Sequence, residues 1–355
     1  MGSTSLIGVD IGSSSVKMVE LSVARKNSNA YRVERYVIEP LPRDAMLDGN
    51  IVSLEAVSES LRRGWKRMET RLKTVALALP AAAVTTKKII VPAGQREDDL
   101  LFQVETEASQ YIPFALDEVN LDFQVVGPAP GNPEEVEVLI AASRKEKVED
   151  RVAVALTAGL KAVVMDVEPY AAQAAFELIE DRLPGGGKDQ IIALVDIGAT
   201  GININVLCNK QSVYMPNQPQ PFGGDHLTRE IQSYFNLLPG EAEAAKRSGE
   251  LTDNYKTDVL QPFREALVLE VARALQFFFT STQFTAVNYI FLAGGCAVIP
   301  ELDEAVAART QVDTLVANPF IGMELSNRVA PKQLSIDAPS LLVACGLALR
   351  SFDRS

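Results

Sequence analysis

"GVDIGSSSVKMVEL", residues 8–21, is the stretch that decides the fold. An apolar run ends at Asp10, turns through Gly12 and three consecutive serines, and resumes as a run in which apolar and polar residues alternate. Short runs of this kind on both sides of a glycine-rich turn predict a β-hairpin. A second stretch, "ALVDIGATGININVL" at 193–207, aligns with the first without a gap. The chain therefore contains two related halves, each with one such hairpin.

The two hairpins carry similar residues at aligned positions. The aligned pairs are Asp10 with Asp196, Gly12 with Gly198, and Ser14 with Thr200. Turns rich in glycine and serine present successive backbone N–H groups toward one point, and such nests bind anions, phosphate above all. Two facing turns can hold a triphosphate between them. We therefore predict a phosphate site formed by Gly12, Ser13, Ser14, Ser15, Gly198, Ala199 and Thr200.

Charged residues beside these turns suit a phosphate and its metal ion. Asp10 and Asp196 stand at strand ends, where they can hold Mg²⁺ directly or through its waters. Mg²⁺ prefers oxygen ligands and keeps several waters when it binds together with phosphates. Lys17, on the second strand of the first hairpin, can reach a phosphate as a point charge. One such turn alone is common in proteins, so the prediction depends on the gap-free repeat.

Two further segments favour a nucleotide. Gly294 and Gly295, followed by Cys296, stand between a predicted strand and a predicted helix. Glycines there let the backbone approach a flat ring or a phosphate closely. In "EAEAAKR", Glu243 and Lys246 are three residues apart and share a helix face. A carboxylate on that face can accept hydrogen bonds from ribose hydroxyls, although the alternative is an ordinary solvated helix face.

Composition excludes several classes of function. The 355 residues have room for two domains, and a formal net charge of −12 argues against nucleic-acid binding, which needs a basic excess. His226 is the only histidine, so a multi-histidine metal site is excluded. Cys208, Cys296 and Cys345 lack metal-ligand or CxxC spacing, which favours a reducing compartment and buried thiols.

No segment of the sequence is predicted to span a membrane. The best apolar run, 152–167, is interrupted by Lys161 and Asp166, and a span needs about 20 apolar residues. The C-terminal "ALRSFDRS" offers no amphipathic anchor. We therefore expect any association with a membrane to depend on a partner.

The pattern along the chain predicts alternating strands and helices with one insertion. Strands are expected at 6–12, 15–21 and 31–38, and an amphipathic helix at 54–68. From about Val84 to Met165 a β-α-β-β-α block interrupts the first half, so we interpret it as an inserted subdomain. On its first helix, Leu101, Val104, Ala108 and Tyr111 recur at helical spacing. They either pack on their own sheet or line, in part, a groove for a partner.

These residues resemble the actin-like ATPase superfamily, which includes actin, DnaK-type chaperones, sugar kinases, FtsA and MreB. Five family motifs occur in the family's order: phosphate 1 at 8–17, connect 1 at "DVEPYAAQAAF", phosphate 2 at 195–203, adenosine at "LAGGCAVIP" and connect 2 at "PSLLVACGLAL". The resemblance implies an α/β, actin-like (ribonuclease H-like) two-lobed fold with an FtsA-type inserted subdomain. It also implies ATP and Mg²⁺ as ligands.

The resemblance assigns further roles residue by residue. Glu168 matches the connect 1 position that orients the attacking water, and Gly224 and Asp225 match the turn before the ribose helix. Glu243, Lys246 and Arg247 match the Glu-x-x-Lys-Arg of that helix. Val298 stands where chaperones carry an arginine over the adenine, and Ser14 where several relatives carry glycine. These departures imply a looser hold on the base and at most a slow ATPase.

Within the superfamily, the sequence looks most like the PilM family of type IV pilus assembly. The resemblance is carried by "LIGVDIGSSSVKMVEL", "EPLPRDAM", "ASQYIPFALDEVNLDFQV" and "EVLIAASRKEKV". It implies a cytoplasmic protein at the inner face of the inner membrane that holds the N-terminal cytoplasmic peptide of PilN and contacts other platform and motor proteins. The partner groove is assigned to Leu101, Val104 and Tyr111. The alternatives are an FtsA-like, self-associating filament-forming ATPase and a small-molecule kinase of the same fold.

The resemblance also implies a division into four subdomains. The expected ranges are 1–83, 166–190 and 338–355 for subdomain 1A, 84–165 for the inserted subdomain 1C, 191–215 and 285–337 for 2A, and 216–284 for 2B.

Overall fold

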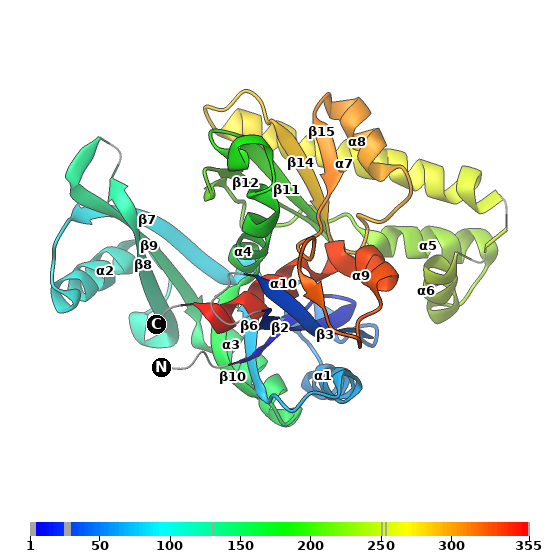
Figure 1. Ribbon diagram of the computed structural model, residues 1–355, viewed down its shortest axis with the longest axis horizontal. Helices are drawn as coiled ribbons and strands as arrows, with labels where there is room; N and C mark the ends of the chain where they lie inside the picture. The colour runs from blue at the N-terminus through cyan, green and yellow to red at the C-terminus, as the bar shows by residue number, and fades with distance from the viewer. Residues whose placement is uncertain (1–4, 25–29, 130, 250, 253, 354–355) are drawn as a thin grey trace.

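Two sheets with the same strand order form the body of the molecule (Figure 1). The computed structural model describes residues 5–24, 30–129, 131–249, 251–252 and 254–353. In sheet order, the first sheet contains β10 (Lys161–Val167), β6 (Thr74–Leu79), β1 (Ile7–Ile11), β2 (Ser15–Val23), β3 (Tyr31–Pro40) and β16 (Glu324–Leu325). The second contains β13 (Gln211–Tyr214), β12 (Ile202–Cys208), β11 (Ile191–Ile197), β14 (Tyr289–Ala293) and β15 (Asp313–Val316).

The two sheets are built alike. In each, the first three strands in the chain form an antiparallel meander, β1–β2–β3 in one and β11–β12–β13 in the other. Two further strands continue each sheet in parallel beyond the first strand, β6 and β10 in one and β14 and β15 in the other. This shared topology confirms the prediction of a two-lobed, ribonuclease H-like arrangement.

Two helices, α4 (Glu168–Glu180) and α10 (Leu342–Leu349), lie between the sheets and share one apolar core with both (Figure 1). Phe176 on α4 is fully buried and meets Phe291 of β14 edge to face, with 4.9 Å between the ring centroids. Every residue of α10 is buried. A side chain at Gly346 would run into the main chain of α4 at Ala171, so the close helix contact depends on glycine.

Other helices cover the outer faces of the sheets. α1 (Leu54–Met68) and α3 (Lys145–Thr157) pack on the first sheet, and α5 (Gly224–Phe235), α7 (Gln261–Ser281) and α8 (Leu302–Thr310) on the second. α1 begins where the side chain of Ser53 accepts a hydrogen bond from the Ala56 N–H, and it ends at Glu69 in the left-handed conformation. Its bounds are those that the apolar periodicity predicts.

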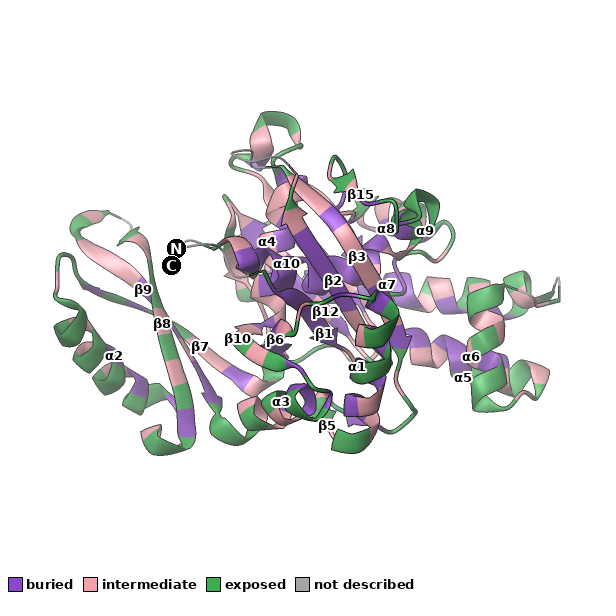
Figure 2. Cartoon of the chain, turned by 60° about the horizontal axis from the view of Figure 1, so that its bottom comes forward, coloured by how far each residue is buried: buried purple, intermediate pink, exposed green. Residues whose placement is uncertain are grey.

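The insertion forms a small subdomain beside the first lobe (Figure 1). Its sheet has the order β7 (Val84–Pro92), β9 (Asn132–Arg144), β8 (Val119–Ala129), and α2 (Glu97–Tyr111) packs on one face around Val104 and Val138. Figure 2 shows that much of this subdomain is exposed, whereas buried residues concentrate in the two main sheets and α10.

The lobe boundaries differ from the expected ranges in two places. We expected the insertion to extend to residue 165, but its sheet ends with β9. The following helix, α3, packs against α1 through Val154 and Ala155, and β10 pairs with β6 of the first sheet. β16 lies within 285–337, the range expected for the second lobe, yet it pairs in parallel with β3 of the first sheet.

The remaining elements connect these layers. They are β4 (Met46–Leu47), β5 (Asn50–Ile51), α6 (Pro239–Ser248), α9 (Pro331–Asp337), the 3₁₀ turns η1 (Ala81–Ala83), η2 (Leu116–Glu118), η3 (Pro184–Gly187), η5 (Ala338–Leu341) and η6 (Arg350–Phe352), and the π-helical turn η4 (Lys256–Leu260). In the described part of the chain, the one helical stretch long and apolar enough to cross a membrane is Pro331–Phe352. Because 72% of its most apolar window is buried inside the protein, we interpret it as a core segment.

Candidate functional site

The first hairpin brings an ion pair to the middle of the first sheet. Asp10 on β1 lies opposite Lys17 on β2, and Lys17 Nζ is 2.8 Å from Asp10 Oδ2. Asp10 is only 6% exposed, so this buried carboxylate is paired with a partly buried counter-ion. The turn closes with a hydrogen bond from the Gly12 N–H to the Ser15 carbonyl oxygen at 3.1 Å.

The second hairpin repeats this geometry. Its turn closes with a hydrogen bond from the Gly198 N–H to the Gly201 carbonyl oxygen at 2.9 Å, at the positions aligned with Gly12 and Ser15. Asp196 lies opposite Asn203, just as Asp10 lies opposite Lys17. The repeat in the sequence is therefore a repeat in structure, but the second hairpin has an amide where the first has an ammonium group.

Two loops close on the second turn. The N–H groups of Gly224 and Asp225, at the start of α5, donate to the carbonyl oxygens of Gly198 and Ala199 at 3.0 and 2.8 Å. The N–H of Cys296 donates to the carbonyl oxygen of Ile197 at 3.2 Å. Gly294 has a φ of 84°, and a side chain there would run into Asp196. The structure thus brings together the predicted segments 198–200, 224–225 and 294–296.

The predicted side chains of α6 face α5. Glu243 Oε2 lies 2.6 Å from Lys246 Nζ, and Glu243 Oε1 accepts a hydrogen bond from Arg247 Nε at 2.9 Å. Burial opposes ionisation of Glu243, but hydrogen bonds from Lys246, Thr228 and Arg247 outweigh it and lower the pKa of this carboxyl. Thr228, at the centre of this network, was not predicted, because the spacing along α5 does not show where α6 crosses it.

Acidic groups from both lobes meet between the hairpins. Burial raises the pKa of Asp196 to about 6 and that of Glu168, at the start of α4, to about 8. The charge of Asp10 raises both, whereas Lys17 opposes the shifts. Burial would lower the pKa of Lys17, but its pairing with Asp10 outweighs that effect and raises the pKa. These mutual effects define one charged cluster that spans the two lobes.

Arg151 on α3 adds a buried cation that the sequence analysis did not identify. Its side chain belongs to a residue only 2% exposed, and its Nε donates to the Ala78 carbonyl oxygen at 2.7 Å. Its charge opposes the rise in the pKa of Glu168. Arg151 falls on the same helix face as Val154 and Ala155, which is the periodic signal that could have indicated its burial.

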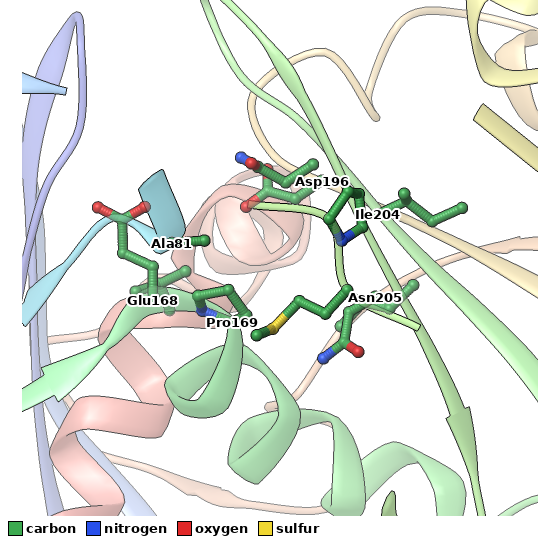
Figure 3. A pocket seen from close by; sticks show the side chains of 11 residues that line it. Ala81, Glu168, Pro169, Asp196, Ile204 and Asn205 are labelled. Carbon is green, nitrogen blue, oxygen red and sulfur yellow. The ribbon is translucent and has the colours of Figure 1, made fainter. Parts of the chain in front are cut away.

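A small cavity lies between the lobes beside these acids (Figure 3). Figure 3 shows Glu168 and Pro169 on one side of it, with Asp196, Ile204 and Asn205 on the other. Its volume is about 30 Å³. Since one water needs roughly 10–15 Å³ by this measure, the cavity has room for about two waters. The complete lining is Ala81, Glu168, Pro169, Leu194, Asp196, Asn203, Ile204, Asn205, Met215, Pro216 and Val343.

A second cavity, of about 150 Å³, lies where the insertion meets the first lobe. Its lining is Ala82, Ala83, Thr85, Ile112, Phe114, Val119, Ala142, Ser143, Arg144 and Lys147. The turn η1 separates the two cavities, because Ala81 lines the first while Ala82 and Ala83 line the second. Ser143 Oγ fixes this turn by donating to the Ala83 carbonyl oxygen at 2.8 Å.

Some of the residues predicted for a partner groove and for the adenine base are exposed, and others are buried. Leu101 and Tyr111 on α2 are 42% and 45% exposed, but Val104 is fully buried in the core of the insertion and its side chain is not available to a partner. Lys87 Nζ lies over the ring of Tyr111. Val298 is 47% exposed beside the 294–296 loop.

Two lobes of one topology, with paired hairpins meeting at a charged cluster and with α4 and α10 between the sheets, define an actin-like ATPase fold. The chain belongs to the family described as type IV pilus assembly protein PilM, whose family model matches residues 8–352.

Solved structures agree with this assignment. A structure described as the PilM-PilN type IV pilus biogenesis complex is 28% identical, with a TM-score of 0.81, over 99% of this chain and 100% of that one. The ethanolamine utilization protein EutJ from Carboxydothermus hydrogenoformans is 17% identical, with a TM-score of 0.59, over 98% of this chain and 90% of that one. MreB 5 of Spiroplasma citri bound to AMPPNP is 14% identical, with a TM-score of 0.50, over 98% and 95%. The last two are similar in fold alone.

Proposed function

We propose that this protein is a cytoplasmic ATP-binding component of the inner-membrane assembly platform of the type IV pilus. In this proposal it binds the N-terminal cytoplasmic peptide of PilN, reaches the membrane through that partner and links it to the pilus motor proteins. Membership of the PilM family supports the pilus role. The 28% identical structure is that of a PilM-PilN complex, which supports PilN as the partner.

The observation that carries the nucleotide part of the proposal is the pair of equivalent turns, one in each lobe, beside a shared cluster of acids. The backbone N–H groups of 13–15 and 199–200 would receive the phosphates, as such nests bind anions elsewhere, while those of Gly12 and Gly198 close the turns. The carboxylates of Asp10 and Asp196 are oxygen ligands of the kind that Mg²⁺ takes, and they act electrostatically on each other. Bound there through water, Mg²⁺ would neutralise phosphate charge.

The small cavity supports water as the phosphoryl acceptor. It lies beside Glu168 and Asp196 and has room for about two waters. Glu168, whose pKa is raised, would orient a water there and accept a proton from it. We therefore favour a slow ATPase over a small-molecule kinase.

The second cavity is our candidate for the partner site. Ala82, Ile112 and Val119 give it an apolar lining, while Arg144 and Lys147 add positive charge. We propose that a peptide of PilN inserts an apolar side chain here, with Leu101 and Tyr111 of α2 available to the rest of the peptide. Because η1 is a wall of both cavities, occupation of one would change the other.

Calorimetric titration of the PilN peptide, with and without ATP and Mg²⁺, tests this proposal. A ligand shifts a conformational equilibrium only by its differential affinity for the states. We expect ATP to change the peptide affinity, and identical affinities would contradict the coupling. Asp196→Ala should abolish the ATP effect, whereas Asp313→Ala, an exposed acid at the far edge of the same sheet, should leave it intact.

A further inference from the structure

Thr228 is a buried hydroxyl at the contact between α5 and α6. The residue is 3% exposed, and its Oγ1 lies 2.8 Å from Glu243 Oε2 and 3.1 Å from the Gly224 carbonyl oxygen, one turn earlier in α5. Lys246 Nζ donates to the same oxygen at 2.8 Å. One hydroxyl therefore joins an anion and a cation on α6 to the start of α5.

The hydrogen bonds of Lys246 are all committed within the protein. An ammonium group has three donors. Those of Lys246 are taken by Glu243 Oε2, Thr228 Oγ1 and the Gly224 carbonyl oxygen, at 2.6, 2.8 and 3.3 Å. Lys246 thus ties α6 to the turn at Gly224 and has no donor left for a ligand in this arrangement.

Glu243, by contrast, keeps one open acceptor position. A carboxylate offers about four lone-pair sites on two oxygens. Oε2 accepts hydrogen bonds from Thr228 and Lys246. Among the described residues, Oε1 accepts one only from Arg247. The Glu243 side chain is 33% exposed, and its charge acts on the thiol of Cys296 in the neighbouring loop. The carboxylate of Glu243 is therefore partly open to solvent and near enough to the 294–296 loop to act on it electrostatically.

We propose that Thr228 is a positioning residue that makes this site specific for nucleotides whose sugar carries a free hydroxyl donor. The proposal rests on the proposed nucleotide binding. Thr228 and Lys246 together occupy Oε2, so Oε1 is left as the acceptor for one sugar hydroxyl. Without the Thr228 hydroxyl, Lys246 loses an acceptor and Glu243 loses a donor, and the carboxylate can turn away from the orientation that leaves Oε1 open.

The test compares the affinities of ATP, 2′-deoxyATP and 3′-deoxyATP for the full chain by calorimetry. A hydrogen bond to a charged group contributes enough to give at least about tenfold discrimination. We expect the wild type to prefer ATP by that factor over one of the deoxy analogues. Thr228→Val should reduce the preference to less than about threefold, mainly through weaker ATP binding. Thr228→Ser, which keeps the hydroxyl, should restore it.

Two further variants make the test decisive. Thr310→Val is the matched control, because Thr310 Oγ1 lies 2.8 Å from the carbonyl oxygen four residues back in α8, much as Thr228 Oγ1 lies 3.1 Å from that of Gly224 in α5. It should leave all affinities and their ratio unchanged. Glu243→Gln should lose the preference as Thr228→Val does, and it replaces that variant should the valine protein fail to fold.

The outcomes separate this inference from the proposed function. A wild type that binds none of the three nucleotides refutes the proposed function and this inference with it. A wild type that binds ATP, with a preference that Thr228→Val leaves unchanged, refutes only the inference. Equal weakening of ATP and the deoxy analogues by Thr228→Val also refutes it, because a purely structural role would act on all three alike.

Discussion

Replacing Lys17 with methionine would leave the buried carboxylate of Asp10 without its counter-ion. Breaking a buried ion pair by removing one partner costs about 3–5 kcal/mol. The side chains of Lys17 and Asp10 are 17% and 8% exposed, so we take the lower end, about 3 kcal/mol. At roughly 2 °C per kcal/mol for a large chain, the melting temperature should fall by about 6 °C.

The assay is thermal unfolding at pH 7 without nucleotide. Arg273→Met is the control, since it removes an arginine that is 61% exposed from its pair with Glu270, and such surface pairs contribute less than about 1 kcal/mol. The double variant Asp10→Asn with Lys17→Met should recover most of the loss, because a neutral amide needs no counter-ion. A single Lys17→Met variant no less stable than Arg273→Met would refute the reasoning.

Three further predictions concern packing and pH. Gly346→Ala should lower the unfolding free energy by about 3 kcal/mol in urea titrations, because its Cβ would meet the main chain of Ala171, whereas Gly240→Ala, with open space around it, should be neutral or slightly stabilising. Phe176→Ala, which empties the layer between the sheets, should cost about 3–5 kcal/mol in the same assay. The pKa of Glu168 is about 8 in the folded chain and 4.5 in the unfolded one. Since the folded state then holds the extra proton, stability should fall as pH rises from about 5 to 8, and less steeply in Glu168→Gln. Melting temperatures that fall equally steeply with pH in the wild type and in Glu168→Gln would contradict this assignment.

The local pattern of the sequence was enough to predict much of the fold. The aligned hairpins around Asp10 and Asp196 specify the two lobes, because the strand, the glycine turn and the second strand of each hairpin are contiguous in the sequence. The bounds of α1 follow from the spacing of its apolar residues.

What could not be predicted depends on contacts between distant segments. The periodicity of α3 shows that one face is buried, but not that this face packs on the first sheet rather than on the insertion. The role of Thr228 depends on the crossing of α5 and α6, and the commitment of Lys246 on the distances at that crossing. β16 has two residues, too few for any pattern to indicate a strand.

The tail of the chain has a consequence for biosynthesis. The sheet of the second lobe uses strands from one continuous stretch, 191–316, so all of it leaves the ribosome together. The first lobe can complete its fold only later, because β16 pairs with its β3 and α10 packs on its β1 at Gly8. Domains generally fold as units during synthesis. The half that is translated first should therefore be the one that matures last, with its apolar layer exposed to chaperones until residues 342–349 have left the ribosome.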